Sequence, residues 1–158
     1  MNAVEATRTC LRKYAVFPGR AGRGEYCWFL VVAIAASLLL AGVDRLFWTP
    51  QTSALFEAIF ALAIFLPLIA AGFRRLHDTG RPGWLMMIAV AASATGKLLL
   101  EGGLLNFHFF APPVRSPAGA ATVALAAAVP IFGVAALLAL PSQPDPNRYG
   151  PNPHEVTP

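Results

Sequence analysis

The stretch Arg74-Arg75-Leu76-His77-Asp78-Thr79-Gly80-Arg81-Pro82-Gly83-Trp84 separates two apolar runs, residues 53–73 and 84–100. If a helix continues past Phe73, Arg74 and Asp78 are four residues apart on it and can pair, with His77 beside them. Gly80 suits a left-handed C-terminal cap, and Pro82-Gly83 suits a turn. The stretch therefore predicts the polar end of one apolar helix and a tight connection to the next.

Four long apolar runs make up about half of the chain: residues 28–43, 53–73, 84–100 and 122–140. Of the 158 residues, 56% are hydrophobic and 13% charged, whereas soluble domains have roughly a quarter of their residues charged. A helix needs about 20 apolar residues to cross a bilayer, and lipid-exposed segments must be helical because no water satisfies their backbone. The sequence predicts an all-α integral membrane bundle of four transmembrane helices.

The basic residues indicate the orientation of these helices. Nine of the 12 Lys and Arg residues fall before the first run, between the second and third, or after the fourth. Because cationic loops stay in the cytoplasm, this asymmetry predicts that both termini are cytoplasmic. We expect one domain, 1–158, made of a cytoplasmic N-terminal segment 1–25, a four-span region 26–140 and a cytoplasmic tail 141–158. The nine residues are Arg8, Arg12, Lys13, Arg20, Arg23, Arg74, Arg75, Arg81 and Arg148.

Three further features have no single interpretation. Residues 5–17 have a weak amphipathic pattern, which fits a helix lying on the membrane and a disordered basic tail equally well. The long apolar segment 101–121 fits an interfacial loop or a short re-entrant helix. Cys10 and Cys27 match neither a redox pair nor a zinc site, so we expect free thiols.

Two other polar clusters accompany the central stretch. One runs from Phe17 to Trp28 as FPGRAGRGEYCW, and the other from Asn147 to Pro153 as NRYGPNP. With the central RRLHD and GW residues, this ordered set resembles the DUF805 family of small bacterial inner-membrane proteins. Arg81-Pro82 departs from the family pattern, which more often has Ser beside the Gly-Trp. The resemblance implies a multi-pass protein of the bacterial inner (plasma) membrane, and it implies no established reaction.

The span count brings the three clusters to one cytoplasmic face, where we expect a network that links them. Glu25 is expected to meet an arginine of the central stretch, and Asn147 or Tyr149 to close over them. His77 is expected to donate hydrogen bonds to tail carbonyls or to the backbone beside Asp78. The candidates for this network are Glu25, His77, Asp78, Asn147, Arg148 and Tyr149.

The arginines of this face also suggest an anionic ligand, because guanidinium groups bind phosphate through paired, planar donors. Anionic membrane lipids are the expected partners, with a protein partner or a second copy of the chain as alternatives. Ordinary positive-inside topology explains the same charges without a pocket. The basic residues flank membrane spans, so we do not expect nucleic acid as a partner. The ligand-binding candidates are Arg20, Arg23, Arg74, Arg75 and Arg81.

Catalysis is not expected, and we assign no catalytic residue, cofactor or metal ligand. His77 and Asp78 are adjacent on a helix and point about 100° apart, so they do not readily share a metal. The sequence has no HExxH or phosphate-binding loop motif. A subunit of a small transporter or channel is the alternative function, although the spans have no charge at their centres, where an ion path would need one.

Overall fold

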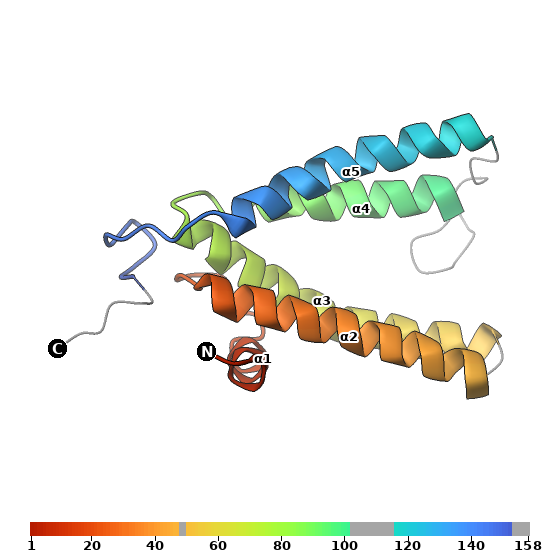
Figure 1. Ribbon diagram of the computed structural model, residues 1–158, viewed down its shortest axis with the longest axis horizontal. Helices are drawn as coiled ribbons and strands as arrows, with labels where there is room; N and C mark the ends of the chain where they lie inside the picture. The colour runs from red at the N-terminus through yellow and green to blue at the C-terminus, as the bar shows by residue number, and fades with distance from the viewer. Residues whose placement is uncertain (48–49, 102–115, 153–158) are drawn as a thin grey trace. The chain divides into compact units, whose positions relative to one another are not determined.

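The computed structural model describes residues 1–47, 50–101 and 116–152, and within these ranges the chain forms helices and no strands. Three helices are long and apolar enough to cross a membrane, over Arg23–Val43, Ile59–Asp78 and Pro117–Ala139, and a shorter apolar helix covers Leu85–Leu100. The all-α prediction is confirmed for these ranges. The helices are α1 (Ala3–Arg12), α2 (Arg23–Phe47), α3 (Pro50–Asp78), α4 (Leu85–Glu101) and α5 (Pro117–Ala139) (Figure 1).

The chain divides into two compact units, one made of Met1–Gly83 and the segment from Leu138 onward, the other of Trp84–Leu137. The second unit contains α4 and most of α5. A Cβ atom added to Gly96 would lie 3.0 Å from the Cβ of Ala127. Small residues therefore let these two helices approach closely, as in many membrane helix pairs.

In the first unit α2 and α3 form an antiparallel pair. The amide of Ala21, just before α2, donates to the carbonyl of Arg74 near the end of α3 at 3.0 Å. Phe29 and Ala33 of α2 are buried, as are Ile69 and Ala70 of α3. The pair therefore has an apolar seam and ends with the N-terminus of α2 beside the C-terminus of α3.

The N-terminal segment contains a helix, α1, as one of its two interpretations proposed. Asn2 and Glu5 form a reciprocal capping box at its start, a signature that satisfies two free amides. Its residues Ala6 and Cys10 are fully buried. Figure 1 shows α1 nearly end-on while α2 and α3 run across the view, so α1 lies crosswise to both.

A tyrosine links the end of this segment to the middle of α3. Pro67 lies inside α3 and has no amide hydrogen, so the carbonyl of Ala63 lacks its normal helical donor. The hydroxyl of Tyr14 donates to that carbonyl at 2.7 Å. Tyr14 thus satisfies a backbone group that the proline leaves open.

The central stretch folds as its sequence predicts. Helix α3 continues past Phe73 to Asp78, and Gly80 follows with φ +73°. The amide of Gly80 donates to His77 and that of Arg81 to Leu76, both at 3.0 Å, which is the Schellman pattern of helix termination. A Cβ atom on Gly83 would clash with the ring of Phe73.

The predicted loop 101–121 falls largely outside the described residues, so its interfacial or re-entrant conformation stays a prediction. Helix α5 begins at Pro117, five residues before the apolar run 122–140 that predicted it. Helix α2 likewise begins at Arg23, ahead of the run 28–43. The apolar runs identify these helices but miss their first turns, which are polar in α2 and rich in small residues in α5.

Candidate functional site

Five charged side chains are buried where α2 begins and α3 ends, and we call them the buried charge cluster. Ionised groups are almost never buried unless they are paired, because removal from water is costly. The cluster joins three guanidinium groups to two carboxylates, so it carries one net positive charge. Its members are Arg20, Glu25, Arg74, Arg75 and Asp78.

Asp78, the last residue of α3, is the centre of the cluster. Its Oδ1 accepts from Nε of Arg20 at 2.9 Å, and its Oδ2 pairs with Nη1 of Arg75. The side chains of Arg75 and Asp78 are fully buried, and that of Arg20 is 1% exposed. One carboxylate thus pairs with two arginines from different parts of the chain.

Arg74 has a different partner from the one that its spacing suggests. Its Nη2 donates to Oε1 of Glu25 at 2.9 Å, and its Nη1 donates to the carbonyls of Lys13 and Val16. The expected Arg74–Asp78 pair is therefore wrong. The i,i+4 geometry permits that pair, but Asp78 is already occupied by Arg75 and Arg20, while Glu25 lies within reach of Arg74.

The polypeptide after α5 is held by arginines through its main chain. Arg75 donates to the carbonyls of Leu138 and Leu140, the first through Nε at 2.9 Å. Arg20 donates to the carbonyl of Gln143 at 2.6 Å and to that of Asp145 at 2.9 Å. These carbonyls occupy the donors that phosphate oxygens would use in an anion site.

Beside the charge cluster, His77 forms a second group of contacts with the tail. Its ring stacks on the ring of Tyr149 with 3.9 Å between centroids, and its Nδ1 lies 3.1 Å from the carbonyl of Gly19. The side-chain amide of Asn147 donates to the carbonyl of His77 at 2.9 Å. Asn147 and Tyr149 therefore close over the end of α3, and His77 meets Gly19 rather than a tail carbonyl.

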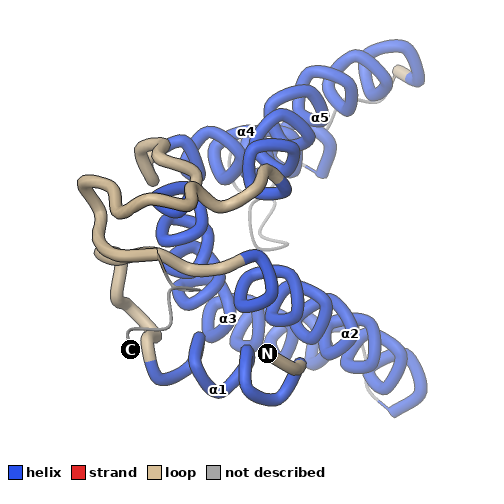
Figure 2. The backbone as a smooth tube through the Cα atoms, turned by 60° about the vertical axis from the view of Figure 1, so that its left-hand side comes forward, coloured by secondary structure: helices blue, strands red, loops and turns tan. Residues whose placement is uncertain are grey.

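Figure 2 shows that the α1–α2 connection and the tail both run past the end of α3. The amide of Gln143 donates to the carbonyl of Asp78 at 3.0 Å, which adds a main-chain link. Three segments that are far apart in sequence meet here.

The remaining candidates lie at the surface. Arg23, Arg81 and Arg148 are exposed. Nε of Arg23 donates to the carbonyl of Leu140 at 3.1 Å, and the guanidinium of Arg148 lies 4.7 Å from the ring centroid of Tyr149. The prediction that the five arginines bind an anionic ligand stays a prediction, but each terminal nitrogen of Arg20, Arg74 and Arg75 already has an internal partner.

Sequence reasoning missed Cys10, which lies against Glu25. Its Sγ is 3.9 Å from Oε1 of Glu25. Burial and the nearby negative charge of Glu25 raise the pKa of the Cys10 thiol to about 12. A thiol in this state is protonated at neutral pH and unreactive. In the part of the chain that the structure describes, no group of three His, Cys, Asp or Glu side chains is arranged to hold a metal.

Comparison with known proteins gives a family and two similar proteins. A model for proteins of unknown function, DUF805, matches residues 14–151. The inner membrane protein YhaH of Escherichia coli K12 is 35% identical over 80 residues, which cover 49% of this chain and 66% of YhaH. The inner membrane protein YhaI of the same strain is 39% identical over 87 residues, which cover 51% of this chain and 67% of YhaI. No solved structure is significantly similar to the chain.

Proposed function

This chain belongs to the DUF805 family, and we propose that it is a four-span inner-membrane protein whose cytoplasmic face binds anionic lipid headgroups without catalysing a reaction. The main observation in support of this proposal is that the buried charge cluster joins three chain segments into one face and leaves other arginines exposed on it. These exposed arginines include Arg8, Arg12, Arg23 and Arg81. The similar proteins YhaH and YhaI are named as inner membrane proteins, which supports the location.

The contacts of Arg75 support an even number of crossings. Arg75, near the end of α3, donates to the carbonyls of Leu138 and Leu140 at the end of α5. The chain that leaves α3 must therefore return to the same side of the membrane. Because α5 has 23 apolar-rich residues, it is long enough to cross, and α4 must then cross as well. Helix α4 has 17 residues, or roughly 26 Å at ~1.5 Å per residue, near the lower limit for a span.

The orientation follows from the charges at this meeting point. The segments around Arg20, Arg74 and Arg148 carry most of the basic residues, and such segments stay in the cytoplasm. Both termini would then be cytoplasmic. Fusions of a reporter that fluoresces only in the cytoplasm test this, and a dark reporter at the C-terminus would refute it.

The arginines divide between two roles. Those of the buried charge cluster use their terminal nitrogens internally, so they hold the face together. The exposed ones have charge available for the membrane, where each basic residue near an anionic leaflet contributes about 1 kcal/mol of attraction. Native mass spectrometry of the purified protein tests the role: we expect it to retain phosphatidylglycerol in preference to phosphatidylethanolamine. Equal retention of the two lipids would contradict a binding role for the charges.

The polar groups of the spans give transport less support than the exposed arginines give lipid binding. Hydroxyls of Ser37, Ser93 and Thr122 donate to carbonyls of their own helices, four residues back, at 2.7–2.9 Å. These hydroxyls satisfy local backbone and do not form a polar path. Liposome flux assays separate the two functions, because solute movement that depends on the purified protein would favour a transporter or channel. A protein partner or second copy on the same face would instead be captured by crosslinking in whole membranes.

A further inference from the structure

An open groove lies between α1 and α2. Its volume is about 650 Å³, within the ~300–1,000 Å³ range of ligand pockets. Val4 and Leu11 of α1 and Val32 of α2 form an apolar wall, and Arg8 and Arg12 lie along it. The groove thus combines an apolar surface with two cationic groups.

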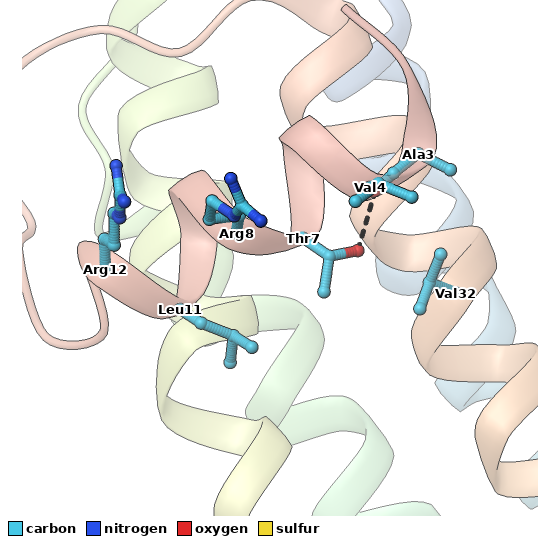
Figure 3. Close-up of a pocket in the computed structure, with 7 residues that line it drawn as sticks. All are labelled: Ala3, Val4, Thr7, Arg8, Leu11, Arg12 and Val32. Carbon is cyan, nitrogen blue, oxygen red and sulfur yellow. Dashed lines mark hydrogen bonds between the residues drawn. The ribbon is translucent and has the colours of Figure 1, made fainter.

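The two kinds of side chain are separated in space. Figure 3 shows the guanidinium groups of Arg8 and Arg12 above α1, the side chain of Leu11 below it, and Val32 on α2 at the right. Val32 lies roughly 14 Å along α2 from Arg23 at ~1.5 Å per residue, so the apolar part of the groove reaches well into a candidate span. An amphiphile could place its charged end at the arginines and its chain beside Val32.

The side chains of the groove are free to meet such a ligand. Val4 is 70% exposed and Leu11 46% exposed, although both are apolar. Arg8 and Arg12 are exposed, four residues apart on one helix face, and no hydrogen bond or ion pair of their guanidinium groups is found in the described ranges. Because two neighbouring guanidinium groups bind a phosphate through charge-assisted hydrogen bonds, their ligand should be anionic.

The wall that carries these residues is fixed to the rest of the first unit. Ala6 and Cys10 bury the opposite face of α1, and Tyr14 bonds to the carbonyl that Pro67 leaves open in α3. A fixed wall lowers the ordering cost of binding. The groove is therefore suited to hold a single ligand molecule and not only a diffuse layer of lipid.

We infer that the groove between α1 and α2 binds one anionic phospholipid, with its phosphate at Arg8 and Arg12 and an acyl chain along Val4, Leu11 and Val32. This site deepens the proposed function and rests on it. It differs from the site of the arginines that the sequence singles out, because Arg8 and Arg12 belong to α1 and not to the three polar clusters. Charge selects an anionic ligand, and the apolar wall selects one with a hydrocarbon chain.

The test compares phosphatidylglycerol retention in native mass spectra for three variants of the full chain. Arg8→Gln with Arg12→Gln is expected to weaken retention about thirtyfold, the scale of two lost headgroup contacts. Val32→Trp, which fills the groove without changing charge, should weaken it as well. Lys13→Gln with Arg148→Gln removes the same charge from exposed positions that do not line the groove, and should keep wild-type retention within about twofold.

The outcomes separate this site from the proposed function. If the control pair loses as much lipid as Arg8→Gln with Arg12→Gln, and Val32→Trp loses none, the attraction is diffuse and the groove is refuted while lipid binding stands. If the wild-type protein shows no preference for phosphatidylglycerol, both proposals fail. If glycerol phosphate competes for the site as strongly as the lipid does, the role of the apolar wall in binding an acyl chain is refuted. Thermal unfolding of each variant checks that loss of lipid does not reflect loss of fold.

Discussion

Replacing Asp78 with asparagine removes the carboxylate that Arg20 and Arg75 both contact. The side chain keeps its shape, but one of its two oxygens becomes an amide group that donates hydrogen bonds toward a guanidinium, which also donates. The net charge of the buried charge cluster rises from +1 to +2. Two arginines that are almost fully buried are left without a full charge partner.

The expected size of the effect follows from this burial. Removing one partner of a buried ion pair costs about 3–5 kcal/mol, because the remaining charge is uncompensated. Asp78 serves two such pairs, so we expect the upper part of that range. For a chain of this length 1 kcal/mol corresponds to roughly 2–4 °C in Tm, so Asp78→Asn should lower Tm by about 10 °C or more.

Thermal unfolding in detergent, followed by circular dichroism, measures the effect. Asp145→Asn is the matched control, because Asp145 is exposed and only its main-chain carbonyl contacts Arg20. Surface changes of this kind are usually within about 0.5 kcal/mol of neutral. We also expect Asp78→Asn to expose the tail to protease, since Arg20 and Arg75 hold its carbonyls. If Asp78→Asn and Asp145→Asn melt within about 2 °C of each other, the cluster does not stabilise the fold.

A double-mutant cycle examines the reason for the loss. Arg75→Gln alone leaves Asp78 paired with Arg20 but leaves the carbonyls of Leu138 and Leu140 without their donor. In the Asp78→Asn background the same change also removes an unpaired buried charge. It should therefore cost less there than in the wild-type chain. Equal costs in both backgrounds would show that the two residues act independently.

Three further changes probe other parts of the first unit. Tyr14→Phe should destabilise the protein by about 1 kcal/mol in thermal unfolding, because the Ala63 carbonyl loses its donor; an unchanged Tm would mean that the hydroxyl is not needed there. Cys10 should react with maleimide more than tenfold slower than Cys27 in the folded protein at pH 8, because its pKa is raised to about 12 and the thiolate is the nucleophile, and equal rates would contradict its burial. Because the pKa of Cys10 is raised from 9.0, the protonated thiol's contribution to stability is present below pH 9 and is lost between about pH 9 and 12. Unfolding of the wild type and of Cys10→Ala over this pH range measures that contribution. Gly83→Ala should lower Tm by several degrees, because its Cβ would clash with the Phe73 ring. Gly42→Ala is the control and should not lower Tm, because a Cβ at Gly42 meets nothing within 4 Å. Similar Tm changes in both variants would argue against the close approach of Gly83 to Phe73.

Local features could be predicted from the sequence because they depend on nearby residues. The left-handed Gly80 and the continuation of α3 to Asp78 follow from a short stretch, and both are confirmed. The pairing of Arg74 could not be predicted in the same way. Spacing along one helix offers Asp78 as its partner, but the choice between Asp78 and Glu25 depends on where α2 begins relative to α3.

The tail contacts were beyond prediction for a different reason. Arg75 and Arg20 bond to main-chain carbonyls of Leu138, Leu140 and Gln143, and a carbonyl is present at every residue. No residue type marks those positions in the sequence. The side-chain partners are easier to anticipate, since Asn147 and Tyr149 belong to a recognisable polar cluster.

These contacts give the arginines of the central stretch a structural role. The sequence suggests that these arginines bind phosphate, because a guanidinium group offers several donors in one plane. In the structure the same property lets Arg75 reach Asp78 and two carbonyls at the end of α5 at once. A lysine has a single compact charge and could not join these groups from one position. The choice of arginine at the end of α3 is therefore explained by the joining of chain segments. The anionic lipid that we propose would instead use exposed arginines such as Arg8 and Arg12.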